Sequence, residues 1–279
     1  MTDERLSDAL TEVAFWRPAA CAGLELRRAR YRRHTFARHL HGVWSLGLVL
    51  EGETRFSLHG RDWQAGAGDL VLIPPGEVHD CNPYGETPLG YWMFYLDTPP
   101  AISGPLQPTA PWHTLAAVWP AAPDFARWVA LAEAWQQSAD AGMTTEPALV
   151  ERWWAAWAKL LADWPRSVQG AQLTRDDPWL AQVAERLAGE LSRPLSLAEL
   201  SEETGISASH LNRRFAASYG LPPHRYQLQC RLDAAKRLLR RGLLISAVAH
   251  ELGFSDQSHF TRWFRRCVGA TPARYQQGH

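Results

Sequence analysis

The chain has 279 residues, with 29 basic side chains, 29 acidic side chains and 46% hydrophobic residues. This length is sufficient for two domains that each bury a hydrophobic core. No apolar run reaches the roughly 18 residues of a membrane-spanning helix, and the first ten residues are too polar for a signal peptide. The four cysteines include no C-x-x-C pair, so we expect a reduced, cytoplasmic protein without a disulfide framework.

The first half of the chain has the pattern of a small all-β domain. No element is predicted before residue 20, and β-type runs then alternate with turns rich in glycine and proline. The spacing of these turns is typical of an antiparallel barrel or sandwich. The predicted strands span residues 24–31, 44–50, 55–58, 70–73 and 90–96.

Three histidines lie in motifs that resemble those of the cupin barrels. Residues 68–79 resemble the second half of the cupin motif, with His79 at the position of a metal-binding histidine, and His39-Leu40-His41 resembles the H-x-H of the first half. Enzymatic cupins place a glutamate four or five residues after the H-x-H, where this chain has Ser45 and Leu46. The resemblance therefore implies an effector pocket rather than a catalytic centre.

Two alternatives to a metal-free pocket remain open. Imidazole ligands suit Zn, Ni, Cu or Fe, and a site made of three histidines leaves coordination positions open, so His39, His41 and His79 are candidate metal ligands. A cupin enzyme fused to the second domain is the third interpretation. An anionic effector would require an arginine in the barrel, and the candidates are Arg28, Arg30, Arg38 and Arg55. The predicted effector-binding residues are His39, His41, Trp44, His79 and Cys81.

Two tryptophan-rich helices are predicted after the barrel. Trp128 and Trp135 belong to the first seam, and Trp153, Trp157 and Trp164 belong to the second, at helical spacings of three, four and seven. Such seams pack on their own barrel. Because tryptophan is enriched in interface cores, we also expect one of them to contact a second subunit.

The C-terminal region contains the same short pattern twice. In each copy an apolar pair, a glycine turn and a second apolar pair follow one another, first over residues 197–226 and again over residues 245–275. This is the pattern of a helix-turn-helix, in which a short helix ends at a glycine and a capped second helix begins. Helices are predicted to begin at about Ala208 and Gln257, and Ser196 with Glu199 predicts a capping box at the first entrance.

The second helix of each copy keeps a polar face suited to DNA. Arg, Asn and Gln side chains read guanine and adenine edges in the major groove, and residues 204–279 carry 12 basic against 3 acidic side chains. The predicted base-reading residues are Ser209, Asn212, Arg213, Gln257, Ser258, Thr261 and Arg262, and the predicted phosphate contacts are Arg265 and Arg266.

The region from about residue 180 to residue 276 resembles the DNA-binding domain of the arabinose-regulator (AraC/XylS) family. This resemblance implies two helix-turn-helix units joined by a long helix, here about Pro223 to Arg241 with Gly242 after it, that enter successive major grooves. The second copy carries the stronger signature: Ile245, Ala249, Gly253, Phe254, Asp256, Ser258, Phe260, Arg262, Phe264, Gly269, Pro272 and Tyr275.

These observations predict a two-domain fold. Residues 1–164 form a cupin-like effector-binding and dimerisation domain with two helices after the barrel, residues 165–176 a linker, and residues 177–279 an all-α DNA-binding domain. The resemblance implies a homodimeric transcriptional regulator, more often an activator than a repressor, whose partners are promoter DNA, a small-molecule effector and RNA polymerase. No catalytic residue is predicted.

Overall fold

The computed structural model of the chain describes residues 10–32, 36–58, 61–97, 117–142, 147–165 and 177–278. The chain divides into two compact units, one built mainly from residues 1–35 and 41–171 and the other mainly from residues 172–276. Of the predicted linker, residues 166–176 lie outside the described ranges.

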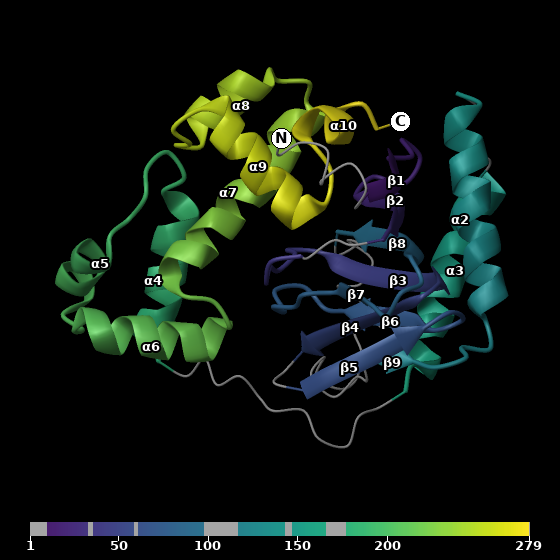
Figure 1. The fold of residues 1–279 in the computed structure, drawn as a ribbon, viewed down its shortest axis with the longest axis horizontal. Helices are drawn as coiled ribbons and strands as arrows, with labels where there is room; N and C mark the ends of the chain where they lie inside the picture. Colours follow the sequence, from purple (N-terminus) through teal and green to yellow (C-terminus); the bar gives the residue numbers. More distant parts are fainter. Residues whose placement is uncertain are drawn as a thin grey trace. The chain divides into compact units, whose positions relative to one another are not determined.

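Two antiparallel sheets form the first unit (Figure 1). The larger sheet has the order β1-β2-β8-β3-β6-β9 and the smaller one the order β5-β4-β7. The strands are β1 (Leu10–Trp16), β2 (Leu24–Tyr31), β3 (Trp44–Glu51), β4 (Glu53–Leu58), β5 (Arg61–Gly66), β6 (Leu70–Ile73), β7 (Asn82–Tyr84), β8 (Leu89–Leu96) and β9 (Val118–Trp119).

The five predicted strands are present, but sequence analysis missed β1, β5, β7 and β9. Each of these strands pairs with only one described neighbour: β1 with β2, β5 and β7 with β4, and β9 with β6. Edge strands bury less side-chain surface and so carry a weaker apolar pattern. In β1 the register also shifts between Leu10 and Glu12, which breaks the alternation further.

Alternation along the central strands gives the large sheet two different faces. One face is apolar, with Leu26 on β2, Leu46 on β3 and Phe94 on β8 in the same hydrophobic core. The other face carries the odd-numbered residues of β2 and β8, such as Arg27 and Tyr95, because successive side chains of a strand point to opposite faces. The sheet therefore separates an apolar layer from a polar one.

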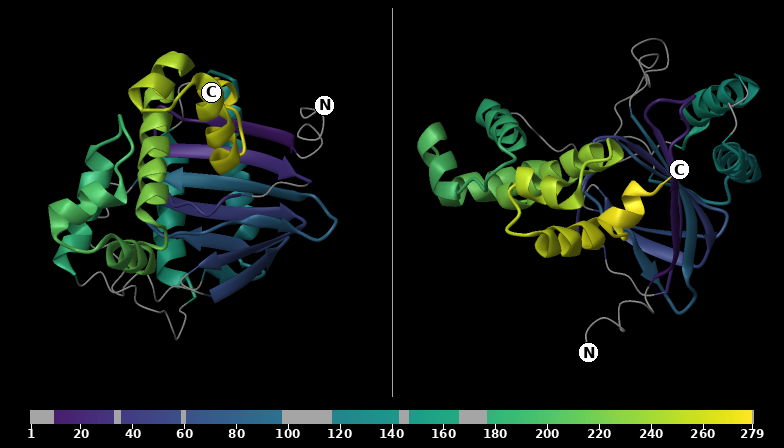
Figure 2. Two further views of the ribbon diagram at one scale, coloured as in Figure 1. Left: turned by 60° about the vertical axis from the view of Figure 1, so that its left-hand side comes forward. Right: turned by 90° about the horizontal axis from the view of Figure 1, so that it is seen from above.

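Helices α2 (Phe125–Asp140) and α3 (Pro147–Asp163) cover the apolar face (Figures 1 and 2). Trp153 lies 4.9 Å from the ring of Phe94 on β8 and stacks on Trp157 at 6.0 Å. All five tryptophans of the two predicted seams are fully buried in this protomer. A second subunit would therefore have to contact the outer faces of α2 and α3 rather than the seam tryptophans.

The second unit is entirely helical among the described residues. The pairs α5–α6 and α8–α9 are the two predicted helix-turn-helix units, and α7 is the long helix that joins them, so the predicted fold class is confirmed. The helices are α4 (Pro178–Gly189), α5 (Leu197–Thr204), α6 (Ala208–Tyr219), α7 (Pro223–Arg240), α8 (Ile245–Glu251), α9 (Gln257–Val268) and α10 (Pro272–Gln276).

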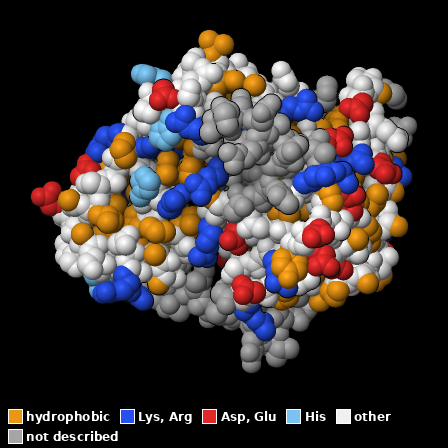
Figure 3. Space-filling model, in the orientation of Figure 1, with side chains coloured by type: hydrophobic (Ala, Val, Ile, Leu, Met, Phe, Trp, Pro, Cys, Tyr) orange, Lys and Arg blue, Asp and Glu red, His pale blue; other side chains and the backbone are white. Residues whose placement is uncertain are grey.

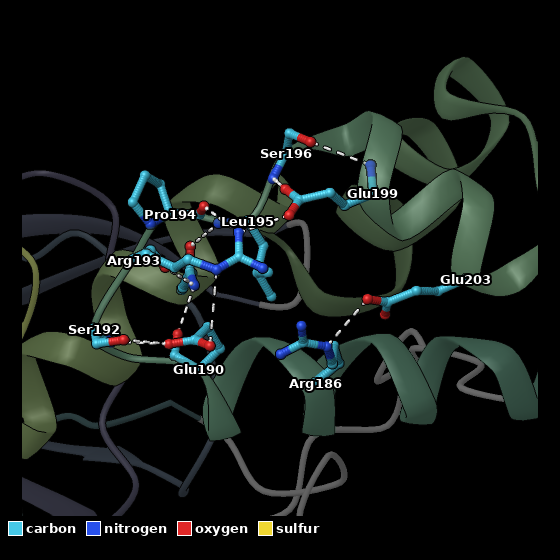
Figure 4. A network of polar contacts seen from close by, with 10 residues as sticks. Arg186, Glu190, Ser192, Arg193, Pro194, Leu195, Ser196, Glu199 and Glu203 are labelled. Carbon is cyan, nitrogen blue, oxygen red and sulfur yellow. Dashed lines mark hydrogen bonds and ion pairs between the residues drawn. The ribbon is translucent and has the colours of Figure 1, made fainter.

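The predicted capping box at α5 is present (Figure 4). Ser196 Oγ accepts a hydrogen bond from the Glu199 backbone N–H at 3.1 Å, and the Ser196 N–H donates to Glu199 Oε2 at 2.8 Å. Arg193 Nη1 also donates to Glu199 Oε1 at 2.6 Å. The α5 entrance is therefore held by reciprocal hydrogen bonds and an ion pair.

The start of α4 has no side-chain cap. Asp177 occupies the N-cap position, but its side chain makes no capping hydrogen bond. Its carboxylate instead accepts a hydrogen bond from Arg214 Nη2 on α6 at 2.6 Å. Asp177 therefore fastens α4 to the first helix-turn-helix unit instead of capping its own helix.

The two turn glycines of the repeat are equivalent in conformation but not in surroundings. Gly205 has φ 70° and Gly253 φ 69°, in the left-handed region that disfavours other residues. A Cβ atom at Gly205 would meet nothing within 4 Å, whereas one at Gly253 would lie 2.1 Å from the Ser192 carbonyl oxygen. The backbone of the second turn therefore packs directly on the loop between α4 and α5.

Replacing each turn glycine with alanine separates these two effects. We expect Gly205→Ala to lower the free energy of unfolding by about 1–2 kcal/mol, the cost of a left-handed alanine. Gly253→Ala adds a backbone clash, so we expect a total loss of about 2–5 kcal/mol. Urea unfolding of the full chain, followed by helical circular dichroism, measures both; equal losses would contradict the close contact with Ser192.

A tryptophan on β3 tests the apolar layer. Trp44 is 1% exposed and meets the ring of Trp157 edge-on at 6.4 Å. We expect Trp44→Ala to lower the free energy of unfolding by about 3–5 kcal/mol, because it empties a large volume in a closed core. Trp154→Ala on α3 is the matched control, since Trp154 is only partly buried, and thermal unfolding should show a clearly smaller loss.

Candidate nucleic-acid interface and effector site

The second helix of each helix-turn-helix unit is anchored by two residues four apart. Leu211 and Phe215 hold α6, and Phe260 and Phe264 hold α9, each with no exposed surface. Because residues four apart lie on one face of a helix, this anchoring turns the opposite face outward. The second helices therefore present a fixed polar face.

The predicted base-reading residues lie on that outward face. Ser209 and Arg213 on α6 are exposed, and Asn212 beside them is half-buried. On α9 the exposed residues are Gln257, Ser258 and Arg262, and the half-buried one is Thr261. The structure thus brings each predicted set together on one helix.

The first turn of α9 is capped by an acidic residue. Asp256 Oδ1 accepts a hydrogen bond from the His259 backbone N–H at 2.7 Å, and Asp256 Oδ2 accepts one from Ser255 Oγ at 3.1 Å. The hydrogen bond from the His259 backbone is the main reason why the pKa of Asp256 is lowered. The carboxylate stays ionised at neutral pH, so one negative charge lies at the N-terminal end of α9.

Basic side chains surround the second helices. Arg265, half-buried, and Arg266, exposed, lie in the last turn of α9. Lys and Arg side chains are spread over the helical unit, and many of the Asp and Glu side chains lie over the β-rich unit (Figure 3). This distribution is suited to phosphate contacts beside the base-reading face.

Two buried side chains, Gln227 and Tyr275, hold the two helix-turn-helix units against α7. Gln227 is 1% exposed, donates to the carbonyl oxygens of Glu190 at 2.6 Å and Arg193 at 2.9 Å, and accepts from the Leu195 N–H at 3.1 Å. At the other end of α7, Arg240 Nε donates to the Tyr275 hydroxyl at 2.9 Å. Sequence analysis did not assign a role to Gln227, because a glutamine inside a helix carries no distinctive pattern.

The polar face of the large sheet centres on a buried arginine that sequence analysis missed. Arg27 on β2 is 4% exposed and donates to the hydroxyls of Tyr31 and, at 3.4 Å, Tyr95. The rings of Phe15 and Tyr91 lie 5.7 Å and 5.6 Å from its guanidinium carbon. This arginine is enclosed by aromatic rings and phenol groups.

The tyrosines around Arg27 are neutral at physiological pH. Burial raises the pKa of Tyr31, Tyr91 and Tyr95 above the usual value near 10, and this outweighs the opposite effect of Arg27. Neutral phenols both donate and accept hydrogen bonds. The cluster therefore favours a ligand group that accepts hydrogen bonds or carries negative charge.

The arginines that sequence analysis considered have other contacts. Arg28 lies 5.4 Å from the ring of Trp92, Arg30 pairs with Glu51, and Arg55 lies 3.4 Å from the centre of the Tyr84 ring. Arg38 is exposed. Arg27 and Arg28 are consecutive residues of β2, so their side chains point to opposite faces of the large sheet, and that of Arg27 points to the polar face.

The three predicted histidines come together. His39, His41 and His79 are buried, and their ligand atoms all lie within 4.8 Å of one another. His39 Nδ1 lies 2.7 Å from the Ala37 carbonyl oxygen and His79 Nδ1 lies 2.9 Å from that of Glu77. A carbonyl only accepts, so Nδ1 donates in both, which leaves Nε2 as the metal-binding atom of each ring.

The histidines adjoin the arginine cluster through one tyrosine. The ring of His41 lies 5.1 Å from the ring of His79 and 5.1 Å edge-on from the ring of Tyr95. Tyr95 also accepts a hydrogen bond from Arg27. Trp44 does not join this group, because it faces the tryptophan core. Burial raises the pKa of the Cys81 thiol to about 12, so this thiol stays protonated.

No helix in the described ranges is long and apolar enough to cross a membrane. Two family models match the chain. Residues 22–104 match an AraC-like ligand binding domain, and residues 200–278 match a helix-turn-helix domain.

The relatives are transcriptional regulators of similar length. The transcriptional activator RhaR of Klebsiella pneumoniae is 27% identical over 264 residues, which cover 89% of this chain and 90% of RhaR. The arabinose operon regulatory protein of Escherichia coli K12 is 24% identical over 256 residues, which cover 84% of this chain and 80% of that protein.

Among solved structures, ToxT of Vibrio cholerae has the same two-part fold. Its TM-score is 0.55 at 12% identity, over 91% of this chain and 97% of ToxT. The two matched domains occur here in the same order as the β-rich unit and the two helix-turn-helix units. The chain therefore belongs to the AraC family of transcriptional regulators, with a ligand-binding domain followed by a helix-turn-helix DNA-binding domain.

Proposed function

We propose that this protein is a homodimeric transcriptional activator that binds promoter DNA in response to a small molecule. The observation that carries the proposal is the matched pair of second helices, α6 and α9, each anchored by buried apolar residues and polar on its exposed face. RhaR, a relative along most of the chain, is named an activator, which supports the direction of control. A protein that acts on promoters works in the cytoplasm, together with RNA polymerase.

The domain boundaries of the proposal follow the sequence. Residues 1–164 sense the effector and pair the subunits, residues 165–176 link the domains, and residues 177–279 bind DNA. Effector binding changes transcription only if the effector has different affinities for two arrangements of the domains. The outer faces of α2 and α3 are the surfaces that we assign to subunit pairing.

The effector site that we propose is the polar face of the large sheet. Arg27 supplies the positive charge, Tyr31, Tyr91 and Tyr95 supply hydroxyl groups, and His41 lies at the edge of the cluster through Tyr95. This chemistry suits a small molecule with a carboxylate or several hydrogen-bond acceptors. We propose sensing rather than catalysis, because Ser45 and Leu46 stand where cupin enzymes have their glutamate.

A metal-dependent sensor is the second candidate, and the histidine cluster favours it. Three imidazoles within 4.8 Å of one another need only a small shift to bind one ion at the usual metal–nitrogen distance of about 2.0–2.1 Å. The backbone carbonyls of Ala37 and Glu77 already orient two of the rings. Zn²⁺, Ni²⁺, Cu²⁺ or Fe²⁺ would fit this set and keep positions open for an effector.

The arginines of the second helices test the DNA-binding proposal. We expect Arg213→Ala and Arg262→Ala each to weaken specific binding by about 1–3 kcal/mol and to relax base preference at one position only, because each removes one bidentate contact. Competition binding against operator variants measures this. Uniform weakening over all sequences would make these residues phosphate contacts.

The matched controls lie on the same helix. Arg265→Ala and Arg266→Ala should weaken binding to all sequences alike and make the dependence of log K on log salt less steep by about one unit each. Titrations at four or more salt concentrations determine this slope. A change in base preference, with the slope retained, would assign these two arginines to base reading instead.

Elemental analysis decides between the two sensors. For the metal-dependent sensor we expect near-stoichiometric metal in untagged protein and none in the His41→Ala/His79→Ala variant, since two of three ligands are lost. Thermal unfolding with and without a chelator provides an independent measurement. Absence of metal in both proteins, with unchanged unfolding, would leave the histidines as hydrogen-bonding groups of a metal-free pocket.

A further inference from the structure

A small cavity lies at the large sheet, away from the helices that cover its apolar face. Its volume is about 230 Å³, and residues of β1, β2, β3 and β8 line it. None of its described lining residues belongs to α2 or α3. Drug-sized ligands occupy cavities of about 300–1,000 Å³, so this cavity is suited to a smaller metabolite.

The register of the strands brings charged side chains to this cavity. Glu12 on β1 pairs with Arg30 on β2, and Ala14 pairs with Arg28. Arg28 and Arg30 are even-numbered like Leu26, which lies in the apolar core, so all three point to the same face of the sheet. Glu12 and Arg28 are diagonal neighbours on that face, with backbones about 7–8 Å apart.

An ion pair forms one wall of the cavity. Arg30 Nε pairs with Glu51 Oε1 at the end of β3. Gly90 on β8 leaves room for this pair, because a Cβ atom at Gly90 would lie 2.7 Å from Glu51 Cγ. The second carboxylate oxygen of Glu51 has no hydrogen-bond partner among the described residues, so it remains available to a donor.

Two further charged side chains at the cavity have no partner of opposite charge. Arg28 and Glu12 are exposed, and neither makes a hydrogen bond or ion pair with a residue in the described ranges. The guanidinium carbon of Arg28 lies 5.4 Å from the ring centre of Trp92, which is 1% exposed. Stacking on a buried ring orients a guanidinium and leaves its N–H groups open to a ligand.

The cavity lies behind the arginine cluster of the polar face. Arg27 and Arg28 are consecutive residues of β2, and Tyr91 both lines the cavity and lies 5.6 Å from the guanidinium carbon of Arg27. The charged side chains of the two sites point to opposite faces of the sheet. The cavity also differs in charge, because it offers one open positive group and one open negative group.

We propose that this cavity is a second small-molecule site and that its ligand is an amino acid. The carboxylate of the ligand accepts hydrogen bonds from Arg28, and its ammonium group donates to Glu12 and Glu51. Leu50, a half-buried residue of the lining, contacts the ligand's side chain. A zwitterion satisfies both open charges, whereas a simple acid or amine leaves one of them unpaired.

Calorimetric titration of the full chain with L-alanine, L-leucine and L-phenylalanine tests the proposal. We expect at least one of them to bind, with one molecule per chain. Its analogues without the ammonium or the carboxylate group should bind about tenfold or more weakly, because each loses one charged contact. For L-leucine these analogues are 4-methylpentanoate and 3-methylbutylamine. No binding at millimolar concentration, or equal binding of the analogues, would overturn the proposal.

Substitutions at the two open charges locate the binding. We expect Arg28→Gln and Glu12→Gln each to weaken amino-acid binding by about tenfold or more. Arg55→Gln is the matched control, because Arg55 is also exposed and lies 3.4 Å from the centre of the Tyr84 ring, but in the smaller sheet. It should leave the affinity unchanged. Full binding in both cavity variants, or an equal loss in Arg55→Gln, would place the ligand elsewhere and overturn the proposal.

A substitution at Gly90 tests the wall of the cavity without removing a charge. The added methyl group of Gly90→Ala displaces the Glu51 side chain, which is only half-buried and able to move. We therefore expect weaker amino-acid binding with a nearly unchanged temperature of unfolding. Unchanged affinity would contradict the contact between the ammonium group and Glu51. These measurements do not depend on DNA binding, so they leave the proposed function untouched whichever result is found.

Discussion

The rigid seating of two recognition helices on α7 is the constraint on which DNA reading depends. Successive major grooves repeat about every 34 Å, so two helices can enter them together only if their separation is fixed. Helix α7 has 18 residues and spans about 27 Å at 1.5 Å per residue. The buried contacts of Gln227 at one end and the Arg240–Tyr275 hydrogen bond at the other hold a unit at each end of this spacer. Gly253 lies in the turn after α8, and Ser192 lies in the loop before α5. Their close approach connects the two helix-turn-helix units a second time.

The β-rich unit places an apolar layer and a polar layer on the two faces of one sheet. The tryptophans of α2 and α3 fill the apolar face and pack there on the ring of Phe94. The opposite face buries the charged side chain of Arg27 together with apolar residues such as Ala29. Arg27 is buried among aromatic rings, and its N–H groups donate hydrogen bonds to the hydroxyls of Tyr31 and Tyr95.

Tyr95 connects the two candidate sensing groups. It accepts a hydrogen bond from Arg27 and contacts the ring of His41. A metal ion on the histidines and a negatively charged effector near Arg27 would therefore be neighbours, and the charge of each would stabilise the other. The two sensor proposals differ only in whether a metal ion is bound. In both, the same residues around Arg27 bind the organic effector.

The sequence by itself determined the helical unit and most of the strands. The repeat, the glycine turns and the apolar pairs depend on local geometry, which can be predicted from the spacing of residues in the sequence. The same spacing identified the outward residues of α6 and α9, whereas the three histidines were identified by their resemblance to the cupin motifs. The strands β1, β5, β7 and β9 were missed, because a strand with one neighbour needs few apolar residues.

Only the tertiary structure decided which side chains meet across the sheet. Sequence alternation could not distinguish Arg27 from Arg28, because the large sheet is buried on both faces and both strand parities carry apolar residues. It also could not show that Trp44 packs on Trp157, more than one hundred residues later in the chain. Burial on both faces removes the alternation from the sequence, and the direction of each side chain is then fixed by the helices that cover one face.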